Sequence, residues 1–249
     1  MIGRVEKHIE DAISRDGAIH LSLIDPENVT PDRAGEIAYK LQKLGSSAIM
    51  VGGSTVVSPH ELDEVVKGIK RRVTIPVILF PNGIAGISQY ADAIFFSTLM
   101  NSMNPYYITG AQALGAPLVK RYGLEVLPMG YLIVGSTPGA AGFVGQAIPL
   151  PVDKPELASM YALAAQYMGM RFVYLEAGSG SVRPVPPEMI SSVRKSVDVK
   201  LIVGGGIRTP EQASEAVKAG ADAIVTGTII ENSTIENAER LIISIRKKN

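Results

Sequence analysis

The sequence predicts a single α/β domain folded as a closed barrel of eight parallel strands, a (β/α)₈ barrel, for three reasons. The chain has 249 residues, which is the usual size of such a barrel. Eight short apolar runs alternate with segments of helical periodicity, as is typical of parallel strands joined by crossover helices. The last two runs, Leu201–Gly206 and Ala223–Thr228, lead into glycine loops, and the loops after strands seven and eight of these barrels frequently bind phosphate.

Composition excludes several classes of protein. With 46% apolar and 19% charged residues, the chain is not intrinsically disordered. Its 24 basic and 24 acidic residues cancel, so no global charge attracts nucleic acid or an anionic membrane. The absence of cysteine rules out disulfides, thiolate nucleophiles and cysteine-based metal sites. The three histidines, His8, His20 and His60, lack metal-ligand spacing.

No stretch of the sequence is apolar enough to direct or anchor the protein to a membrane. The first residues, MIGRVEKHIEDAISRDG, lack the apolar core of a signal peptide. No run of about 20 apolar residues occurs, so we expect no transmembrane segment. We therefore expect a cytoplasmic protein.

The first third of the chain contains a leading helix, Arg4–Arg15, and then three strands. Apolar residues of the leading helix recur on one face at helical spacing. Thr30 is the expected N-cap of the next helix, with Pro31 at its first position and Gly45 at its end. The expected elements are the strand Ala18–Ile24, a helix from Pro31 to about Leu44, the strand Ala48–Val51, the helix Pro59–Arg71 and the strand Val77–Phe80.

The middle third contains a long loop that is dense in glycine and proline, Gly135–Pro151. It is too long for an ordinary connection, so we expect a lid or binding loop inserted within the single domain. The elements around it are the strand Ala93–Phe96, the helix Pro105–Leu114, the strand Glu125–Val134, the helix Pro155–Met168 and the strand Phe172–Leu175.

The last third completes the alternation. Thr209 is the expected N-cap of a helix that begins with Pro210, and its N-terminus adds partial positive charge beside the glycine loops. The elements are the helix Pro187–Ser196, the strand Leu201–Gly206, the helix Thr209–Ala219, the strand Ala223–Thr228 and the helix Ile235–Lys248.

Candidate functional residues follow the strands, because the site of such a barrel lies at the carboxyl ends of its strands. Asp25 follows the first strand; it suits a Mg²⁺ ligand or a general base, and equally a helix cap ahead of Pro26. Ser54 follows Gly52 and Gly53. Its hydroxyl suits a Mg²⁺ shell, although its position alone favours an ordinary turn residue.

Glu176 is the sharper candidate. Alternation along the strand places Tyr174 and Glu176 on the side of the barrel interior. A carboxylate at the mouth of an apolar interior is costly without a partner. A general base or a polyol ligand explains it, and the alternative is a buried ion pair, for example with Arg208. The Gly178–Gly180 segment that follows allows close backbone approach and favours the functional reading.

Glycine clusters follow strands six, seven and eight. Each is common in plain turns, but the three together indicate a phosphate site. Its candidate residues are Gly178, Ser179, Gly180, Gly205, Gly206, Gly227 and Thr228.

A second zone, Phe95–Tyr107, mixes apolar and aromatic side chains. With Met129, Tyr131 and the 135–151 loop it suits the lining of a long apolar groove. Ordinary core packing explains it as well, and both readings stay open.

Six motifs together make the chain resemble the geranylgeranylglyceryl phosphate synthase family, the archaeal ether-lipid prenyltransferases related to bacterial heptaprenylglyceryl phosphate synthases. They are LSLIDPE (Leu21–Glu27), VGGST (Val51–Thr55), LFPNG (Leu79–Gly83), YLEAGSG (Tyr174–Gly180), VGGGIR (Val203–Arg208) and VTGTIIE (Val225–Glu231). The resemblance implies a modified TIM barrel in which an extended segment replaces one connecting helix and opens a groove for a prenyl chain. We place that gap at Phe95–Tyr107.

The resemblance also implies the reaction. A geranylgeranyl group would pass from geranylgeranyl diphosphate to the C3 hydroxyl of sn-glycerol 1-phosphate, as the first ether-bond step of archaeal membrane lipid synthesis. Mg²⁺ on Asp25 and Ser54 would hold the diphosphate, and Glu176 with Tyr174 would be catalytic. The implied glycerol phosphate site comprises Tyr174, Leu175, Glu176, Ala177, Gly178, Ser179, Gly180, Gly205, Gly206, Gly227 and Thr228.

The long loop and the NSMNPYY segment at 101–107 look more like the archaeal branch, which implies a homo-oligomer, a hexamer in particular. A lipid substrate leaves peripheral association with the membrane open. Alternatives are a different prenyl length, an isomerase or synthase on a phosphate-binding barrel, and a non-catalytic phospholigand-binding barrel. The isomerase usually needs an acid–base pair at strands one and five, and strand five here ends in apolar residues and glycine. A mere binding barrel would not need both Asp25 and Glu176.

Overall fold

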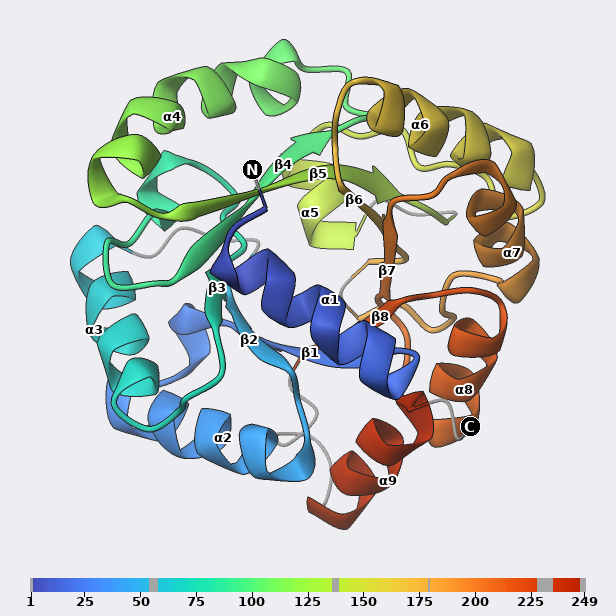
Figure 1. Ribbon diagram of the computed structural model, residues 1–249. Coiled ribbons are helices and arrows are strands. Elements are labelled where there is room, and N and C mark those ends of the chain that lie inside the picture. Colours follow the sequence, from blue (N-terminus) through green and yellow to red (C-terminus); the bar gives the residue numbers. More distant parts are fainter. Residues whose placement is uncertain (1, 54–57, 136–138, 179, 228–234, 247–249) are drawn as a thin grey trace.

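The computed structural model describes residues 2–53, 58–135, 139–178, 180–227 and 235–246. Eight parallel strands form a closed barrel in the order β1-β2-β3-β4-β5-β6-β7-β8. Helices surround the ring of strands (Figure 1). The predicted (β/α)₈ barrel is confirmed.

The strands agree with the eight predicted runs to within a few residues. They are β1 (Ile19–Ile24), β2 (Ala48–Val51), β3 (Val77–Leu79), β4 (Ala93–Leu99), β5 (Glu125–Ile133), β6 (Phe172–Glu176), β7 (Lys200–Gly204) and β8 (Ala223–Thr226). The helices are α1 (Arg4–Asp16), α2 (Pro31–Leu44), α3 (Pro59–Lys70), α4 (Ala111–Tyr122), α5 (Gly139–Val144), α6 (Pro155–Tyr167), α7 (Pro187–Ser196), α8 (Pro210–Lys218) and α9 (Ile235–Ile245). Two 3₁₀ turns, η1 (Pro26–Asn28) and η2 (Ile84–Gly86), and a π-helical segment that leads into α4, η3 (Tyr106–Gly110), lie between them.

The predicted helix caps are present. The Thr30 hydroxyl accepts a hydrogen bond from the Arg33 N–H at the start of α2, and Gly45 ends that helix in the left-handed conformation. Thr209 and Gln212 form a reciprocal capping box at the start of α8. These caps satisfy backbone groups that the first and last turns leave unpaired, so the sequence fixes these helix ends locally.

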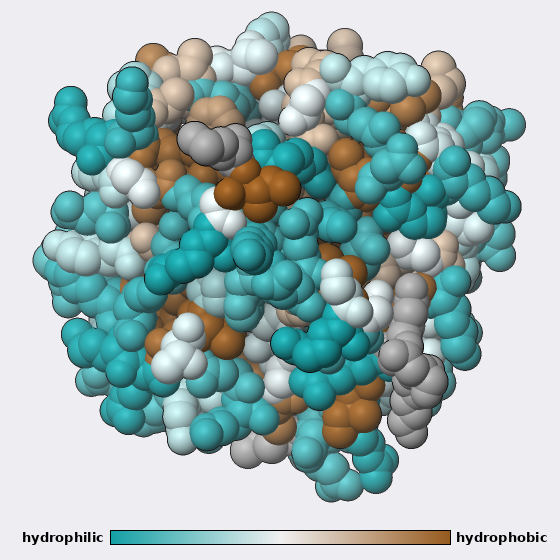
Figure 2. Space-filling model, in the orientation of Figure 1, coloured by the Kyte–Doolittle hydropathy of each residue, from teal (hydrophilic) through white to brown (hydrophobic). Residues whose placement is uncertain are grey.

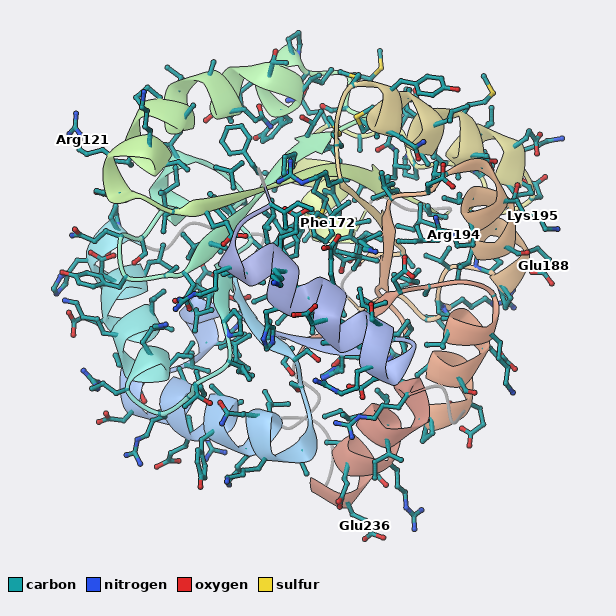
Figure 3. The ribbon with its side chains drawn as sticks, viewed as in Figure 1. Arg121, Phe172, Glu188, Arg194, Lys195 and Glu236 are labelled. Atoms are coloured by element: carbon teal, nitrogen blue, oxygen red, sulfur yellow. The ribbon has the colours of Figure 1, made fainter. Side chains whose placement is uncertain are left out.

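The barrel interior is filled by apolar and aromatic side chains that alternate along the strands. Phe172 contacts Phe95 edge to face, with the ring centroids 5.6 Å apart, and Tyr131 contacts Tyr174 with a centroid distance of 5.2 Å. Figure 3 shows Phe172 within the ring of strands, whereas charged residues such as Glu188 lie at the outer rim. The interior is therefore a packed core rather than a channel.

Helix α1 covers the end of the barrel where the strands begin, and it lies across the ring in Figure 1. The Glu125 carboxylate at the start of β5 accepts the N–H groups of Val5 and Glu6, at 2.7 and 2.8 Å. The Arg171 guanidinium donates to both carboxylate oxygens of Glu6, at 2.6 and 2.8 Å. Figure 2 shows that this face is largely hydrophilic. A binding site is therefore expected at the opposite end.

The connection from β3 to β4 has no full helix: residues 80–92, all of which the structure describes, contain only the single turn η2. The placement of the gap at Phe95–Tyr107 was wrong, because β4 pairs with β5 along its whole length and residues 106–122 are helical. The reason is local. Pro81, Gly83 and Gly86 interrupt the β3–β4 connection and disfavour a helix there.

The predicted long loop contains a short helix, α5, that the sequence analysis did not expect. Asn101 holds the loop to the barrel: its side-chain amide donates to the carbonyls of Ile133 and Ile148, at 2.9 and 2.7 Å. Residues 136–138 of the loop lie outside the described residues. Among the residues described, no helix is long and apolar enough to cross a membrane.

Candidate active site

A cavity of about 600 Å³ lies at the carboxyl ends of the strands. One end is formed by the glycine loops after β6, β7 and β8, including Gly205, Gly206 and Gly227. Asp25 and Glu176 also line the cavity, which continues between η2 and α4. A single space therefore joins a glycine-rich end to an apolar end and has two carboxylates in its wall.

Glu176 is the last residue of β6 and is buried, with 7% of its surface exposed. Its Oε1 accepts a hydrogen bond from the Gly178 N–H at 2.8 Å. Burial raises the pKa of Glu176, and hydrogen bonds from the Tyr174 hydroxyl and the Gly178 N–H oppose that rise. A carboxylate with a raised pKa is a stronger proton acceptor once ionised.

The alternative that Glu176 forms a buried ion pair with Arg208 is wrong. The Arg208 guanidinium donates instead to the carbonyls of Gly180 and Ser181, at 3.3 and 3.0 Å. No salt bridge to Glu176 is found among the residues described here. Arg208 lines the glycine-rich end of the cavity, where its positive charge suits a bound anion.

Tyr174 supports Glu176 from the barrel interior. Its side chain is 1% exposed, and its ring contacts those of Tyr131 and Phe80, with centroid distances of 5.2 and 5.7 Å. Burial, and then the charge of Glu176, raise the pKa of Tyr174 well above its ordinary value, so its hydroxyl stays a donor. Gly204 makes this position possible, because a Cβ there would overlap the Tyr174 hydroxyl.

The glycine loops form the other wall. Gly205 has a φ of 79°, and a Cβ there would lie 2.8 Å from the Gly178 nitrogen. Only glycine meets both requirements, so the loops after β6 and β7 can pack together beside Glu176. The adjoining capping box begins α8, whose N-terminus adds partial positive charge. Backbone N–H groups and this charge together suit a phosphate.

The predicted glycerol phosphate residues divide into four groups. Those that line the cavity are Tyr174, Glu176, Gly180, Gly205, Gly206 and Gly227. Leu175 and Ala177 instead pack in the apolar layer between the sheet and the helices, and Gly178 acts through its hydrogen bond to Glu176. Ser179 and Thr228 lie outside the described residues.

Asp25 is both a cap and a cavity residue. Its Oδ1 accepts the Glu27 N–H at 3.0 Å at the start of η1, so the capping interpretation is confirmed. The same side chain lines the cavity. Burial raises the pKa of Asp25, and the hydrogen bond from Glu27 opposes this.

The donor set at Asp25 fits a Mg²⁺ ion that a substrate brings with it. Mg²⁺ keeps several waters and is usually held by one or two carboxylates together with substrate phosphates. In the described part of the chain, no group of three or more metal-ligating side chains occurs, so Asp25 would supply one carboxylate. A Cβ at Gly53 would lie 2.6 Å from Asp25 Oδ1, so the glycine leaves the carboxylate accessible. Ser54, the second predicted ligand, lies outside the described residues.

The apolar end exists because β3 is short. It pairs with β4 only at Ile78 and Leu79, and η2 replaces the crossover helix. Ile84, Ile87 and Phe96 line the space that remains. The groove that the sequence suggested at Phe95–Tyr107 is therefore present, and Phe95, Phe96 and Tyr107 form part of its wall. Met129 instead packs in the barrel interior.

Gln112 holds this wall together. Its Nε2 donates to the carbonyls of Ser97 on β4 and Tyr107 on η3, at 2.6 and 3.2 Å. The Ser97 carbonyl lies on the part of β4 beyond the end of β3. The Gln112 Oε1 is buried without a hydrogen-bond partner, which is costly. The amide nitrogen thus joins β4 to η3 through two backbone carbonyls.

Sequence reasoning assigned no role to several cavity residues: Phe80, Pro81, Asn82, Gly83, Ile84, Ile87 and Gln112. The first four belong to the LFPNG motif at the end of β3. The rule that sites gather at strand ends could have found them. Gln112 carries no such signal, because a glutamine within a helix is usually on its solvated face.

Comparisons with known proteins cover nearly the whole chain. Residues 11–247 match the PcrB family. The chain is 57% identical to a geranylgeranylglyceryl phosphate synthase of Thermococcus gammatolerans, over 96% of this chain and 94% of that protein. It matches the crystal structure of (S)-3-O-geranylgeranylglyceryl phosphate synthase from Thermoplasma acidophilum, in complex with substrate sn-glycerol-1-phosphate, with a TM-score of 0.92 and 41% identity over 99% of both chains. A thiamine phosphate pyrophosphorylase from Pyrococcus furiosus matches with a TM-score of 0.59 and 15% identity, over 93% of this chain and 97% of that chain, which shows the fold alone.

Proposed function

The chain belongs to the PcrB family and, with its relatives, to the geranylgeranylglyceryl phosphate synthases, and from this we propose that it transfers a geranylgeranyl group from geranylgeranyl diphosphate to the C3 hydroxyl of sn-glycerol 1-phosphate. The products are geranylgeranylglyceryl phosphate and diphosphate. The observation that carries the proposal is the single cavity that joins the glycine loops to an apolar groove past Asp25 and Glu176. The glycine loops suit the phosphate of the acceptor, and the apolar groove suits a prenyl tail.

The acceptor is oriented by its phosphate. The backbone around Gly205, Gly206 and Gly227, with the Arg208 side chain nearby, would bind the phosphate and point the C3 hydroxyl at Glu176. Holding the reacting hydroxyl in place converts an encounter in solution into a reaction within one complex.

Glu176 then accepts the proton of that hydroxyl. The C3 oxygen forms a bond to C1 of the prenyl group, the bond from C1 to the diphosphate oxygen breaks, and the electron pair leaves with the diphosphate. The buried position of Glu176, which raises its pKa, suits it to take up this proton. The rings of Phe80, Tyr131 and Tyr174 contact one another and line the cavity together with Glu176, so their faces would stabilise positive charge that develops on the allylic carbon.

Asp25, together with Ser54, would hold Mg²⁺ at the diphosphate end. Bound there, Mg²⁺ supplies positive charge that neutralises the departing diphosphate. Asp25 contributes a carboxylate that its hydrogen bond from Glu27 keeps in one orientation. The prenyl tail would occupy the apolar space between η2 and α4, and the depth of that space would set the prenyl length.

The rival barrel enzymes fit the site less well. β5 ends in buried apolar residues, Leu132 and Ile133, so the acid–base pair of an isomerase lacks its member there. The likeness to thiamine phosphate pyrophosphorylase shows only a shared barrel. A prenyl chain of another length would use the same residues and differ only in how deeply the groove is filled.

The test is turnover of the purified protein with geranylgeranyl diphosphate, Mg²⁺ and either enantiomer of glycerol phosphate. We expect an ether product, detected by mass spectrometry, with sn-glycerol 1-phosphate only. Farnesyl and heptaprenyl diphosphates, run in parallel, report the prenyl length. Absence of an ether product with every prenyl diphosphate would contradict the proposed reaction.

A further inference from the structure

Four buried polar side chains form a hydrogen-bonded chain where β1 meets β8. The two ring nitrogens of His20 each contact a hydroxyl: Nε2 lies 2.8 Å from Thr226 Oγ1, and Nδ1 lies 2.8 Å from Ser46 Oγ. Ser22 Oγ lies 2.8 Å from Ser46 Oγ. All four residues are at most 7% exposed, and His20 is 2% exposed. His20 is one of the three histidines that lack metal-ligand spacing in the sequence.

This hydrogen-bonded chain of side chains lies on the outer side of the barrel. Leu21 on β1 and Val225 on β8 point into the barrel interior, so their neighbours His20 and Thr226 point outward, toward the helices. Ser46 belongs to the turn between α2 and β2. These side-chain hydrogen bonds therefore connect the last residue of β8 to β1 and to that turn.

Thr226 is the link to the cavity. It is the last residue of β8 and pairs with Ser22 at the last position of the β1–β8 register. The next residue, Gly227, lines the glycine-rich end of the cavity, as does Thr226 itself. The contact between His20 and the Thr226 side chain therefore also sets the position of the backbone of the next residue, Gly227.

Stability alone does not call for a histidine here. Replacing both partners of a buried hydrogen bond by apolar groups of similar shape is often nearly neutral. A fully satisfied polar network instead specifies one arrangement of the elements it joins. Burial lowers the pKa of His20 to about 3, so the ring is neutral, with one nitrogen donating and the other accepting, at any pH near neutrality.

We propose that His20 is a positioning residue for glycerol phosphate: through the Thr226 hydroxyl it fixes the end of β8 and thereby the Gly227 backbone that faces the phosphate. This inference rests on the proposed function for its ligand. It assigns His20 no contact with substrate, so its effect appears in acceptor binding rather than in the chemical step.

Variants that separate the two ring nitrogens test the proposal. In His20→Gln the amide reaches the position of Nε2 and can still contact Thr226. In His20→Asn it reaches only the position of Nδ1 and loses that contact. Thr226→Val removes the hydroxyl itself. Ser46→Ala is the matched control, since it removes an equally buried hydroxyl from the other side of the same ring.

The primary readout is the Kd of sn-glycerol 1-phosphate by titration calorimetry, without prenyl diphosphate, together with Tm. We expect His20→Asn and Thr226→Val to raise Kd about tenfold, equivalent to about 1.4 kcal/mol, and their double variant to raise it no further. His20→Gln and Ser46→Ala should stay within about twofold (about 0.4 kcal/mol) of the wild type, although Ser46→Ala should lower Tm as Thr226→Val does.

Two results would overturn the assignment: an unchanged Kd in His20→Asn and Thr226→Val, or an equal rise in Ser46→Ala, either of which makes the network merely structural. A wild type that binds glycerol phosphate but gives no ether product contradicts the proposed function alone, and the Kd series then still decides the role of His20. A wild type that binds no glycerol phosphate overturns both.

Discussion

At the scale of single residues, the site depends on a buried carboxylate that forms no ion pair with any residue in the described part of the chain. Glu176 is held by hydrogen bonds from Tyr174 and Gly178 rather than by an ion pair. Its burial disfavours the charged form. A group in this state is poised to gain a proton from a substrate, which is the role that the mechanism gives it.

The first prediction is that Glu176→Gln lowers kcat by about 10²- to 10⁴-fold, the usual contribution of a general base, and changes the KM for glycerol phosphate little. Because the pKa of Glu176 is raised and the base acts when ionised, kcat of the wild type should rise with pH through that pKa. In the Glu176→Gln variant, this rise of kcat with pH, the acid limb of the pH–rate profile, should be absent.

The measurement is a pH–rate profile of both proteins, with Glu188→Gln as the matched control. Glu188 lies exposed on α7 at the rim of the molecule (Figure 3), so the control changes the same functional group away from the site. An acid limb that persists in Glu176→Gln would assign the titration to another group, Asp25 first.

Asp25 carries the second prediction. If it supplies the carboxylate of a substrate-borne Mg²⁺, Asp25→Ala should raise the Mg²⁺ concentration needed for half-maximal rate, because the ion keeps only its phosphate and water ligands. The check is a Mg²⁺ titration of the initial rate at saturating substrates. A variant that runs at full rate without added Mg²⁺ would remove Asp25 from the metal site.

The third prediction concerns His20 and the stability of the fold. Its folded-state pKa, about 3, lies below the value of about 6.5 for an unfolded histidine. The unfolded chain therefore binds the proton first as the pH falls. The stabilisation is complete above pH 6.5 and is lost between about pH 6.5 and 3, at up to about 1.4 kcal/mol per pH unit.

Denaturant unfolding of the wild type and His20→Gln from pH 7 to pH 4 measures this. The difference between their free energies of unfolding should shrink as the pH falls, because only the wild type must keep a buried imidazole neutral. A difference that is constant across this range would show that His20 is not buried in the neutral form.

Some of these residues were open to prediction and others were not. Alternation along Phe172–Glu176 placed Glu176 in the barrel interior, and the structure agrees. Whether Glu176 pairs with Arg208 was not predictable from the sequence, because the conformation of the loop after β7 sets the direction of the Arg208 side chain. The role of Gln112 was hidden as well, since it depends on where β3 ends.

At the scale of elements, the groove follows from one missing helix. Residues 80–92, all of them described, connect β3 to β4 with the single turn η2, so this connection packs no crossover helix against β4. Ser88 in this connection donates to Asp63 on α3 at 2.6 Å, which holds it against the neighbouring helix. The space left between η2 and α4 is the apolar end of the cavity.

The fourth prediction tests the wall of this groove. Gln112→Leu removes the donor from the carbonyls of Ser97 and Tyr107 and should lower the free energy of unfolding by about 1–3 kcal/mol. Because these carbonyls fix β4 and η3 on the groove side, the KM for prenyl diphosphate should also rise, with the Kd of glycerol phosphate unchanged.

Gln42→Leu is the control for this variant. The Gln42 side chain also joins two backbone groups, the N–H groups of Thr74 and Ile75, but it does not line the cavity. It should lower stability comparably and leave the KM for prenyl diphosphate as it is. A matching rise in KM in both variants would mean that Gln112 acts only through general stability.

The sequence predicted most elements because caps and turns are local. Thr30, Gly45 and Thr209 set helix ends that the structure reproduces. The position of the missing helix was mispredicted because the mixed apolar and aromatic 95–107 segment suggested a groove, whereas its residues 95–99 continue β4, which pairs with β5. The helix α5 was missed since its sequence, GAAGFV, is glycine-rich and has poor helix propensity.

At the scale of the whole molecule, the two ends of the barrel have separate tasks. The end covered by α1 is closed by charged groups, with Glu6 paired to Arg171 and Glu125 accepting the first N–H groups of the helix. The opposite end carries the cavity. Stability and chemistry therefore depend on different residues, and a change at one end should leave the other intact.

The fifth prediction follows from this separation. Arg171→Met leaves the Glu6 carboxylate, 3% exposed, buried without its cation. The free energy of unfolding should fall by about 1–3 kcal/mol, less than for a fully buried pair because Arg171 is partly exposed. Well below Tm, kcat and both KM values should stay as in the wild type. A large loss of kcat with unchanged Tm would show that the two ends are coupled.

The fold class was the most predictable property at this scale, because strand periodicity and glycine loops repeat along the chain. The continuity of the cavity was not predictable, since it depends on how the ends of separate strands meet. The hexamer that the resemblance implies stays a prediction.

The most direct test of the central claim is a crystal structure with sn-glycerol 1-phosphate and a non-hydrolysable thio-analogue of geranylgeranyl diphosphate. The account predicts the phosphate of the acceptor at Gly205, Gly206 and Gly227, its C3 hydroxyl within hydrogen-bond distance of Glu176, and the prenyl tail between η2 and α4. A tail that leaves the barrel by another path, or a C3 hydroxyl pointing away from Glu176, would contradict it.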